Sequence, residues 1–157
     1  MRKSLLVPMA IGCFALLFGC KLETNLDNDP MFKPMIGRVL RTKKDLVVMT
    51  YPGGKKTLAL DKPGTSGVPE LKDIPKQLPS EYYGRIIHGM LPAGSTFQIT
   101  HIEKVVKFEF SFIDYYGVVT SPGDFKGKIV DVGILTNQST AIPTFIPEYV
   151  EEISSLK

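Results

Sequence analysis

Cysteine and histidine, which serve often as nucleophile, general base or zinc ligand, are few in this sequence. The chain has two cysteines, Cys13 and Cys20, and two histidines, His88 and His101. A thiolate is both a nucleophile and a metal ligand, and histidine is the commonest residue that changes charge near neutral pH. What these four residues can do depends on their neighbours in the sequence.

Cys20 follows a segment with the features of an export signal. Residues 1–4 supply two positive charges, and residues 5–18 are almost entirely apolar. This apolar run is shorter than the roughly 20 residues that a transmembrane helix needs. Gly19 is the kind of small residue found at signal cleavage sites. Cleavage after Gly19 would make Cys20 the new N-terminus.

The residues Leu17-Phe18-Gly19-Cys20 resemble the lipobox of bacterial lipoproteins, in which an aliphatic residue, a variable residue and Gly or Ala precede an invariant Cys. The resemblance implies that residues 1–19 are a lipoprotein signal peptide. It also implies that a diacylglyceryl group is attached to the Cys20 sulfur and that the freed amine is acylated. One acyl chain gives marginal membrane binding, whereas two or three anchor a protein stably. The alternative is that Cys20 is an ordinary buried thiol behind a leader cut elsewhere.

Cleavage before Cys20 leaves 138 of the 157 residues, which is the size of one ordinary domain. Arg2 and Lys3 leave with the signal peptide, so 17 basic residues remain against 16 acidic ones. This balance does not predict nucleic-acid binding, which needs a concentrated basic face. Cys13 also leaves, so we expect no disulfide. By analogy with Gram-negative lipoproteins, Lys21 favours the outer membrane, facing the periplasm; a Gram-positive host would place the anchor in its cell membrane.

Signatures of catalysis are scarce. The sequence has no Gly-x-Ser-x-Gly elbow, and the one mature thiol is the residue expected to carry lipid. His88 and His101 lie in predicted strands on either side of a turn and could approach each other across a hairpin, with Asp131 as a carboxylate partner for His88. A metal site needs a third or fourth ligand. We therefore predict no catalytic site and no cofactor, and the alternative is an envelope enzyme or metal-binding protein that uses both histidines.

Two tyrosine pairs are candidate binding residues. Tyr82-Tyr83 and Tyr115-Tyr116 are each followed by Gly, and adjacent residues of a strand point to opposite faces. Each pair is therefore expected to send one ring inward and one outward. An exposed tyrosine is a common binding anchor, because it buries much area at low entropic cost. We predict Tyr83 and Tyr116 as partner-binding residues; the alternative is that both pack within the domain.

Alternation with a period of two predicts a single mainly β domain over residues 34–157, after the lipidated Cys and a flexible polar tether over residues 20–33. The strand-like runs are residues 37–42, 46–51, 57–60, 85–91, 96–102, 108–119 and 128–135. Residues 61–80 contain four prolines and predict a long loop, either a binding surface or a cover for one end of the domain. Short strands joined by Gly and Pro turns indicate a small antiparallel barrel or sandwich.

The run GMLPAGSTFQITHI, residues 89–102, resembles the turn and following strand of bacterial Src-homology-3-like domains, and residues 123–135 could correspond to a closing strand. This resemblance implies a small antiparallel Src-homology-3-like barrel. At the C-terminus, Pro147 precedes Tyr149, Val150 and Ile153 at helical spacing. This pattern predicts a short helix over residues 147–155 that caps one end of the barrel.

These features favour a non-catalytic outer-membrane lipoprotein. Lipid on Cys20 would hold the β domain at the membrane, where it binds a periplasmic protein or peptidoglycan. One variant is an immunity or inhibitor protein that neutralises a toxin or a hydrolase.

Overall fold

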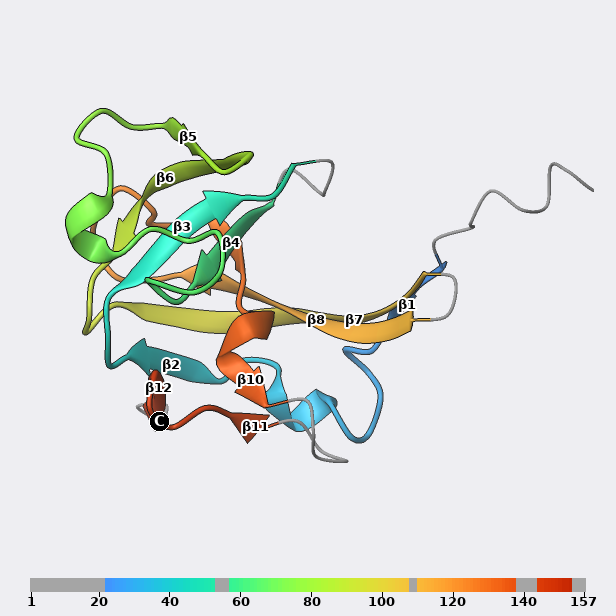
Figure 1. The fold of residues 1–157 in the computed structure, drawn as a ribbon. Helices are drawn as coiled ribbons and strands as arrows, with labels where there is room; N and C mark the ends of the chain where they lie inside the picture. Colours follow the sequence, from blue (N-terminus) through green and yellow to red (C-terminus); the bar gives the residue numbers. More distant parts are fainter. Residues whose placement is uncertain (1–21, 53–56, 108–109, 138–143, 154–157) are drawn as a thin grey trace, which may run out of the picture.

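The computed structural model describes residues 22–52, 57–107, 110–137 and 144–153, and their fold is mainly β (Figure 1). Within these ranges, no helix has the length and apolar character needed to cross a bilayer. Three short 3-10 helices are present, η1 (Lys33–Met35), η2 (Leu71–Asp73) and η3 (Gly133–Leu135). The strands are β1 (Leu22–Asn25), β2 (Val39–Thr42), β3 (Leu46–Thr50), β4 (Leu58–Asp61), β5 (Ser80–Tyr82), β6 (Arg85–Leu91), β7 (Thr96–Lys107), β8 (Phe110–Val119), β9 (Ile129–Asp131), β10 (Thr136–Asn137), β11 (Thr144–Phe145) and β12 (Val150–Ile153).

One sheet dominates the domain, and it is open, so the predicted closed barrel is wrong. Its strand order is β12-β2-β7-β8-β9-β4-β3-β6-β5, with β1 also pairing with β7, while β10 and β11 pair separately. A barrel requires the two outermost strands to pair with each other, but here β12 and β5 end the order. The pairing of β4 with β9 is parallel, so the sheet is mixed.

The sheet bends over itself and encloses one main core. The chain passes from β2 to β3 and from β6 to β7 at the same corner, where β2 pairs with β7 and β3 pairs with β6. Side chains from the two arms of this corner, Leu46 and Val48 of β3 and Phe97 and Ile99 of β7, are buried in the same cluster. The segment that resembles Src-homology-3-like domains forms this corner, and the family resemblance itself stays a prediction.

The longest ladder joins β7 to β8, from Phe97 opposite Val119 to Lys107 opposite Phe110. Its register shifts between Ile99 and His101. Ile99 and Ile102 are both fully buried in the main core although strict alternation would put them on opposite faces, and this bulge allows both to point inward. The far end of β7 and β8 extends beyond the other strands, with β1 beside it (Figure 1).

The predicted helix over residues 147–155 is wrong. Residues 147–149 form a turn, and the following residues form β12, which pairs antiparallel with β2. Val150 is buried in the main core as part of this strand. The helical spacing of apolar residues over 147–155 gave the wrong prediction, because a helix of so few residues has only marginal stability by itself. The edge of β2 offers backbone groups that need partners, and β12 satisfies them.

The segment predicted as a flexible tether, residues 20–33, is folded from Leu22 onward. Strand β1 pairs antiparallel with β7, with Leu22 opposite Val106. The Leu26 N–H donates to the Ile102 carbonyl at 2.9 Å, and Phe32 is buried in the main core. Polar composition favoured a free chain, but a strand edge pairs through its backbone whatever its side chains are. The folded domain thus begins two residues after Cys20.

The proline-rich segment of residues 62–79 covers the outer face of β3 and β6. Val68 of this segment is buried in a second, smaller core with Val47, Met49 and Ile87. The start of the loop is held by Asp61, which accepts hydrogen bonds from the Tyr51 hydroxyl at 2.6 Å and the Lys62 N–H at 2.7 Å. The loop therefore covers one face of the sheet, whereas the predicted covering role was at one end of the domain.

Two neighbouring isoleucines test whether this loop covers the sheet. Ile87 is fully buried, whereas Ile86 is 46% exposed. Removing a buried isoleucine side chain costs about 2–5 kcal/mol, because a cavity adds to the lost transfer free energy. We expect Ile87→Ala to lower the free energy of unfolding by about 2–4 kcal/mol and Ile86→Ala by less than about 1 kcal/mol, measured by urea denaturation. Equal losses would contradict the proposed cover.

Candidate functional site

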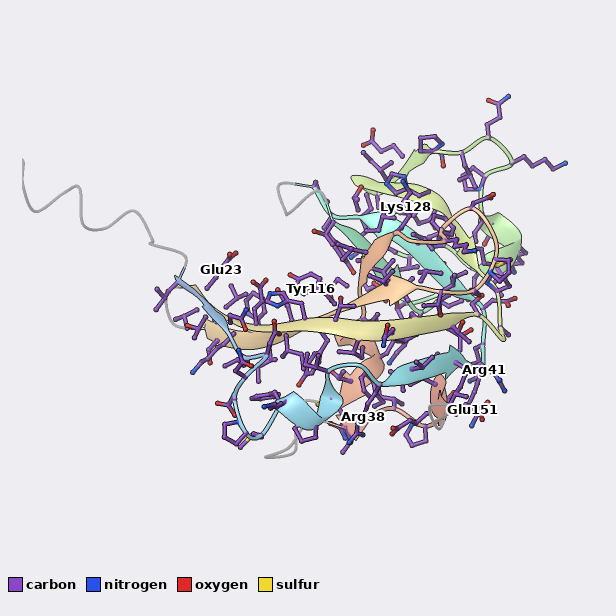
Figure 2. The ribbon with its side chains drawn as sticks, turned by 180° about the vertical axis from the view of Figure 1, so that it is seen from behind. Glu23, Arg38, Arg41, Tyr116, Lys128 and Glu151 are labelled. Atoms are coloured by element: carbon purple, nitrogen blue, oxygen red, sulfur yellow. The ribbon has the colours of Figure 1, made fainter. Side chains whose placement is uncertain are left out.

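The structure brings His101 and Tyr116 together on one face of the β7–β8 ladder. They are directly opposite each other, and their rings stack with centroids 5.7 Å apart. Glu103 and Asp114 form the next pair on the same face, because partners two residues along a ladder share a face. Figure 2 shows Tyr116 on this ladder, between the protruding end and the body of the domain. The result is a group of polar side chains at the outer side of the sheet.

The phenol of Tyr116 is held between two carboxylates. Its hydroxyl donates to Glu103 Oε1 at 2.8 Å and lies 3.2 Å from Asp114 Oδ2. Burial raises the pKa of Tyr116 most, and the hydrogen bond to Glu103 and the negative charges of Asp114, Glu103 and Asp131 raise it further. The phenol therefore stays protonated at neutral pH and serves as a hydrogen-bond donor.

Tyr116 does not fit the predicted role of an exposed binding anchor, because it is only 6% exposed. The prediction assumed that one face of its strand is open to solvent. In fact Tyr115, on the other face, is fully buried in the main core, and the ring of Tyr116 is covered by that of His101. Burial raises the pKa of Tyr115 to about 12. Both faces of β8 are therefore covered at this point.

Asp27 connects the N-terminal segment to His101. One of its oxygens, Oδ2, lies 2.9 Å from His101 Nδ1, and Oδ1 accepts the Ile102 N–H at 2.7 Å. Burial opposes the charged form of Asp27, but the hydrogen bonds from His101 and Ile102 and the attraction of the imidazole outweigh it, so the pKa of Asp27 lies below its ordinary value. This contact fixes the chain that leads from β1 into the core.

The hairpin that was predicted to bring His88 and His101 together is not formed. Strand β6 pairs with β3 and β5, and β7 pairs with β1, β2 and β8. The turn between β6 and β7 takes the chain around a corner and closes no hairpin. His88 Nε2 lies 3.1 Å from Thr50 Oγ1. The histidines line two neighbouring pockets, of about 670 Å³ for His88 and 340 Å³ for His101, which share Thr57 and Ile129.

Among the described residues, no group of three or more His, Cys, Asp or Glu side chains is placed so that it could hold a metal ion. Asp131, predicted as a partner of His88, accepts the Gly133 N–H at 2.8 Å, and its charge raises the pKa of Tyr116. The second ring nitrogen of His101, Nε2, lies 3.7 Å from Glu103 Oε2. A histidine that activates a nucleophile uses one nitrogen for an orienting acid and the other for the nucleophile. His101 has a carboxylate at each nitrogen, an arrangement that suits the docking of Asp27.

Tyr83 lies on a different part of the sheet, in the turn between β5 and β6. Tyr82 pairs with Arg85, so Tyr83 and Gly84 form a two-residue hairpin turn. Tyr83 has a φ of 47°, and such turns favour Asn or Asp at this position, because a bulky residue with positive φ is strained. Tyr83 is 83% exposed, and its ring lies edge-on to that of Tyr82, with the ring centroids 4.8 Å apart.

The conformation of Tyr83 points to a role outside the fold. The left-handed region costs a residue with a side chain about 1–2 kcal/mol, and the exposed ring recovers little of this by burial. Strain of this kind is concentrated at functional positions. The sequence predicted that Tyr83 is exposed, but the strain depends on the pairing register of β5 with β6, which the sequence alone does not give.

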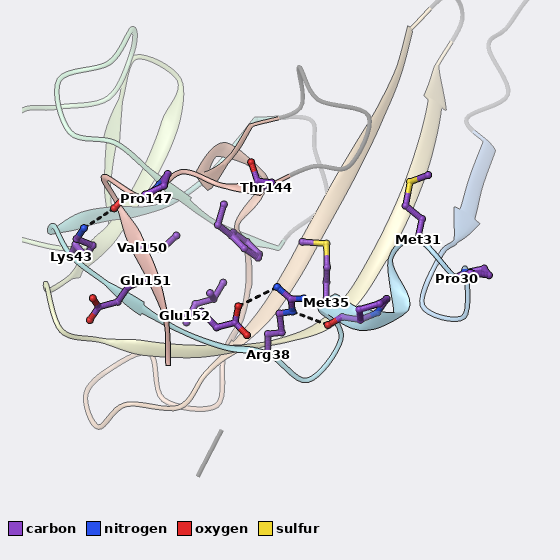
Figure 3. A pocket seen from close by; sticks show the side chains of 13 residues that line it. Pro30, Met31, Met35, Arg38, Lys43, Thr144, Pro147, Val150, Glu151 and Glu152 are labelled. Atoms are coloured by element: carbon purple, nitrogen blue, oxygen red, sulfur yellow. Dashed lines mark hydrogen bonds and ion pairs between the residues drawn. The ribbon is translucent and has the colours of Figure 1, made fainter. Parts of the chain in front are cut away.

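The sequence did not predict a groove of about 650 Å³ between η1, β2, β11 and β12 (Figure 3). Its cations are already paired, because Arg38 donates to Glu152 at 3.1 Å and Lys43 donates to the Pro147 carbonyl at 2.7 Å. The walls come from segments more than a hundred residues apart, which no local pattern connects. Its apolar wall includes Met31, Met35, Leu40, Phe145 and Val150.

Cys20 and the rest of the lipobox lie outside the described residues, so the lipid anchor stays a prediction. Of the predicted binding residues, Tyr83 is exposed and Tyr116 is buried. No protein-family model, curated protein or solved structure matches this chain.

The contact between Asp27 and His101 predicts a defined loss of stability. Asp27→Ala leaves the Ile102 N–H without its acceptor and removes a charged partner of His101, which we expect to cost about 1–3 kcal/mol. The exposed residue Asp73, the last of η2, is a matched control, and Asp73→Ala should change stability by less than about 0.5 kcal/mol. Urea denaturation at pH 7 measures both.

The same contact predicts a pH dependence. Because the folded state lowers the pKa of Asp27 below its ordinary value of 3.8, its contribution is present above that pH and is lost as the pH falls through the folded-state pKa. The stability difference between wild type and Asp27→Ala should therefore shrink below about pH 4. A difference that is constant from pH 7 to pH 2 would show that the charge of Asp27 is not involved.

Proposed function

We propose that this protein is a lipid-anchored envelope protein whose β domain is a non-catalytic binding module and whose main binding residue is Tyr83. The observation that carries the proposal is the exposed ring of Tyr83 in a left-handed backbone conformation. Stability alone would favour Asn there. A strained, solvent-facing tyrosine is best accounted for by a partner that covers it.

The anchor is supported by the lipobox spacing of Leu17 to Cys20. Two or three acyl chains on Cys20 would hold the protein in a membrane. Lys21 favours the outer membrane of a Gram-negative host, with the domain in the periplasm. Because β1 begins at Leu22, the anchor connects to the folded domain through a very short stretch of chain.

The surroundings of Tyr83 favour a protein as the partner. Strand β5 is the last strand in the order, so the backbone groups on its outer side have no neighbouring strand among those described. An exposed strand edge can accept an extended segment of another protein. A periplasmic protein, as in the immunity or inhibitor variant, fits this edge better than a glycan.

The anchor is tested by Cys20→Ser. Mass spectrometry of the wild-type N-terminus should show a chain that begins at Cys20 and carries acyl groups, because lipidation and cleavage both depend on that thiol. The Cys20→Ser variant should retain its leader and incorporate no labelled fatty acid. A wild-type protein with a free Cys20 thiol would contradict the anchor.

The binding residue is tested by Tyr83→Asn. Asn tolerates positive φ, so we expect this variant to be as stable as wild type or more stable by up to about 1 kcal/mol. Loss of a buried aromatic anchor should weaken partner binding by roughly tenfold or more. Crosslinking in the detergent-solubilised envelope, followed by titration with the captured partner, measures the affinity.

Ile134→Asn, at another exposed apolar side chain, is the matched control and should bind normally. Unchanged binding by Tyr83→Asn would rule out Tyr83 as the anchor. Co-sedimentation of wild-type protein with purified peptidoglycan, lost in Tyr83→Asn, would instead identify the cell wall as the partner.

A further inference from the structure

Two exposed apolar side chains lie at the protruding end of the β7–β8 ladder. Phe110, the first residue of β8, is 73% exposed, and Leu22, the first residue of β1, is 62% exposed. Leu22 is opposite Val106, and Phe110 is opposite Lys107, so the two are close to the same level along β7. We call the pair Leu22 and Phe110 the hairpin tip. Neither side chain contributes to the two cores.

The hairpin tip lies close to the predicted lipid. Cys20 precedes Leu22 by two residues, and an extended chain spans at most about 3.6 Å per residue. The Cα atom of Cys20 is therefore within about 7 Å of that of Leu22. If the acyl chains on Cys20 enter a bilayer, the tip must lie at its surface. This inference consequently rests on the proposed lipid anchor.

The tip carries its apolar groups on both faces of the sheet. Cross-strand partners share a face, so Leu22 is on the face of Val106 and Ser111, whereas Phe110, the neighbour of Ser111 in β8, is on the opposite face. A protein that docks on a sheet covers one face. A lipid environment surrounds a tip that enters it end-on, so this distribution favours lipid as the occupant.

Charged residues follow directly behind the tip. Glu23 is one residue behind Leu22, and the exposed Lys104 is two residues behind Val106, which at about 3.3 Å per residue puts them roughly 3 and 7 Å behind the level of Leu22. Figure 2 shows Glu23 near the end of the protruding part. Interfacial segments bury apolar groups by about 5–10 Å while charged groups stay among the headgroups. The tip therefore suits shallow insertion.

We infer that the hairpin tip is a second contact with the lipid bilayer, beside the acyl chains of Cys20. Two contacts fix the orientation of a domain that one lipid anchor alone would leave free to rotate. The turn that carries Tyr83 is well separated from the tip (Figure 1). A domain held by the tip would therefore present this turn away from the headgroups.

The experiment uses the absence of tryptophan from the chain. Phe110→Trp places one fluorophore at the tip, and Tyr83→Trp places one at the exposed turn as a control. The lipidated full-length variants are reconstituted into vesicles of phosphatidylethanolamine and phosphatidylglycerol, with or without bromine on the acyl chains. We expect blue-shifted emission and strong quenching by brominated lipid for Phe110→Trp, and solvent-like, unquenched emission for Tyr83→Trp. Leu22→Trp should show the same blue shift and quenching as Phe110→Trp, and its emission is used instead if Phe110→Trp does not fold.

The outcomes separate the tip from the anchor. If mass spectrometry shows acyl groups and the protein floats with the vesicles, but the tip fluorophores have solvent-like emission, the tip contact is contradicted and the anchor stands. Equal quenching at the tip and at Tyr83→Trp would also contradict it, as would tip emission that shifts only with protein concentration, which indicates self-association. Absence of acyl groups on Cys20 would overturn the proposed anchor and this inference with it.

Discussion

Strand β7 makes backbone contacts with three other strands, and its register determines where the rest of the domain lies. One edge pairs with β8 along most of its length, and the other pairs first with β2 and then with β1. A slip by one residue would exchange the core face for the outer face. The bulge between Ile99 and His101 settles the register, because it turns Ile99 and Ile102 into the core and leaves His101 on the outer face with Tyr116.

This register also fixes how the proposed lipid anchor would connect to the fold. Because β1 pairs with the far end of β7, and Asp27 then holds His101 and the Ile102 N–H, the chain after Cys20 has a fixed path into the domain. The carboxylates of Asp27, Glu103 and Asp114 would otherwise repel one another. The imidazole of His101 and the phenol of Tyr116 lie between them and donate hydrogen bonds to them. A lipid on Cys20 would therefore be attached close to a rigid element, and the anchor together with the hairpin tip would determine which surfaces of the domain face the bilayer.

The sequence predicted the strands well and their partners poorly. Alternation located most strands, because burial of one face leaves a period of two whatever the topology. Pairing is a long-range property, so His88 and His101 were expected across a hairpin that β6 and β7 do not form, and the order of the sheet, open between β5 and β12, was missed. Val150 shows the same limit, because pairing with the edge of β2 makes a strand of a segment that was expected to be a helix. Tyr116 does so too, because the His101 ring covers a side chain that was expected to be on the surface. Tyr83 was predicted to be exposed because adjacent residues of a strand point to opposite faces; it is exposed, but as part of the hairpin turn after β5.

A fixed position of the domain relative to the proposed anchor requires β1 to be part of the sheet. Hydrogen exchange on the full-length lipidated protein, followed by mass spectrometry of the peptide that covers residues 22–28, measures this directly. Amides of a paired strand exchange only when the structure opens. We expect this peptide, including the Leu26 N–H that donates to Ile102, to be protected to about the same degree as peptides of β7 and β8. Exchange at the rate of an unstructured chain, while β7 and β8 stay protected, would contradict the account.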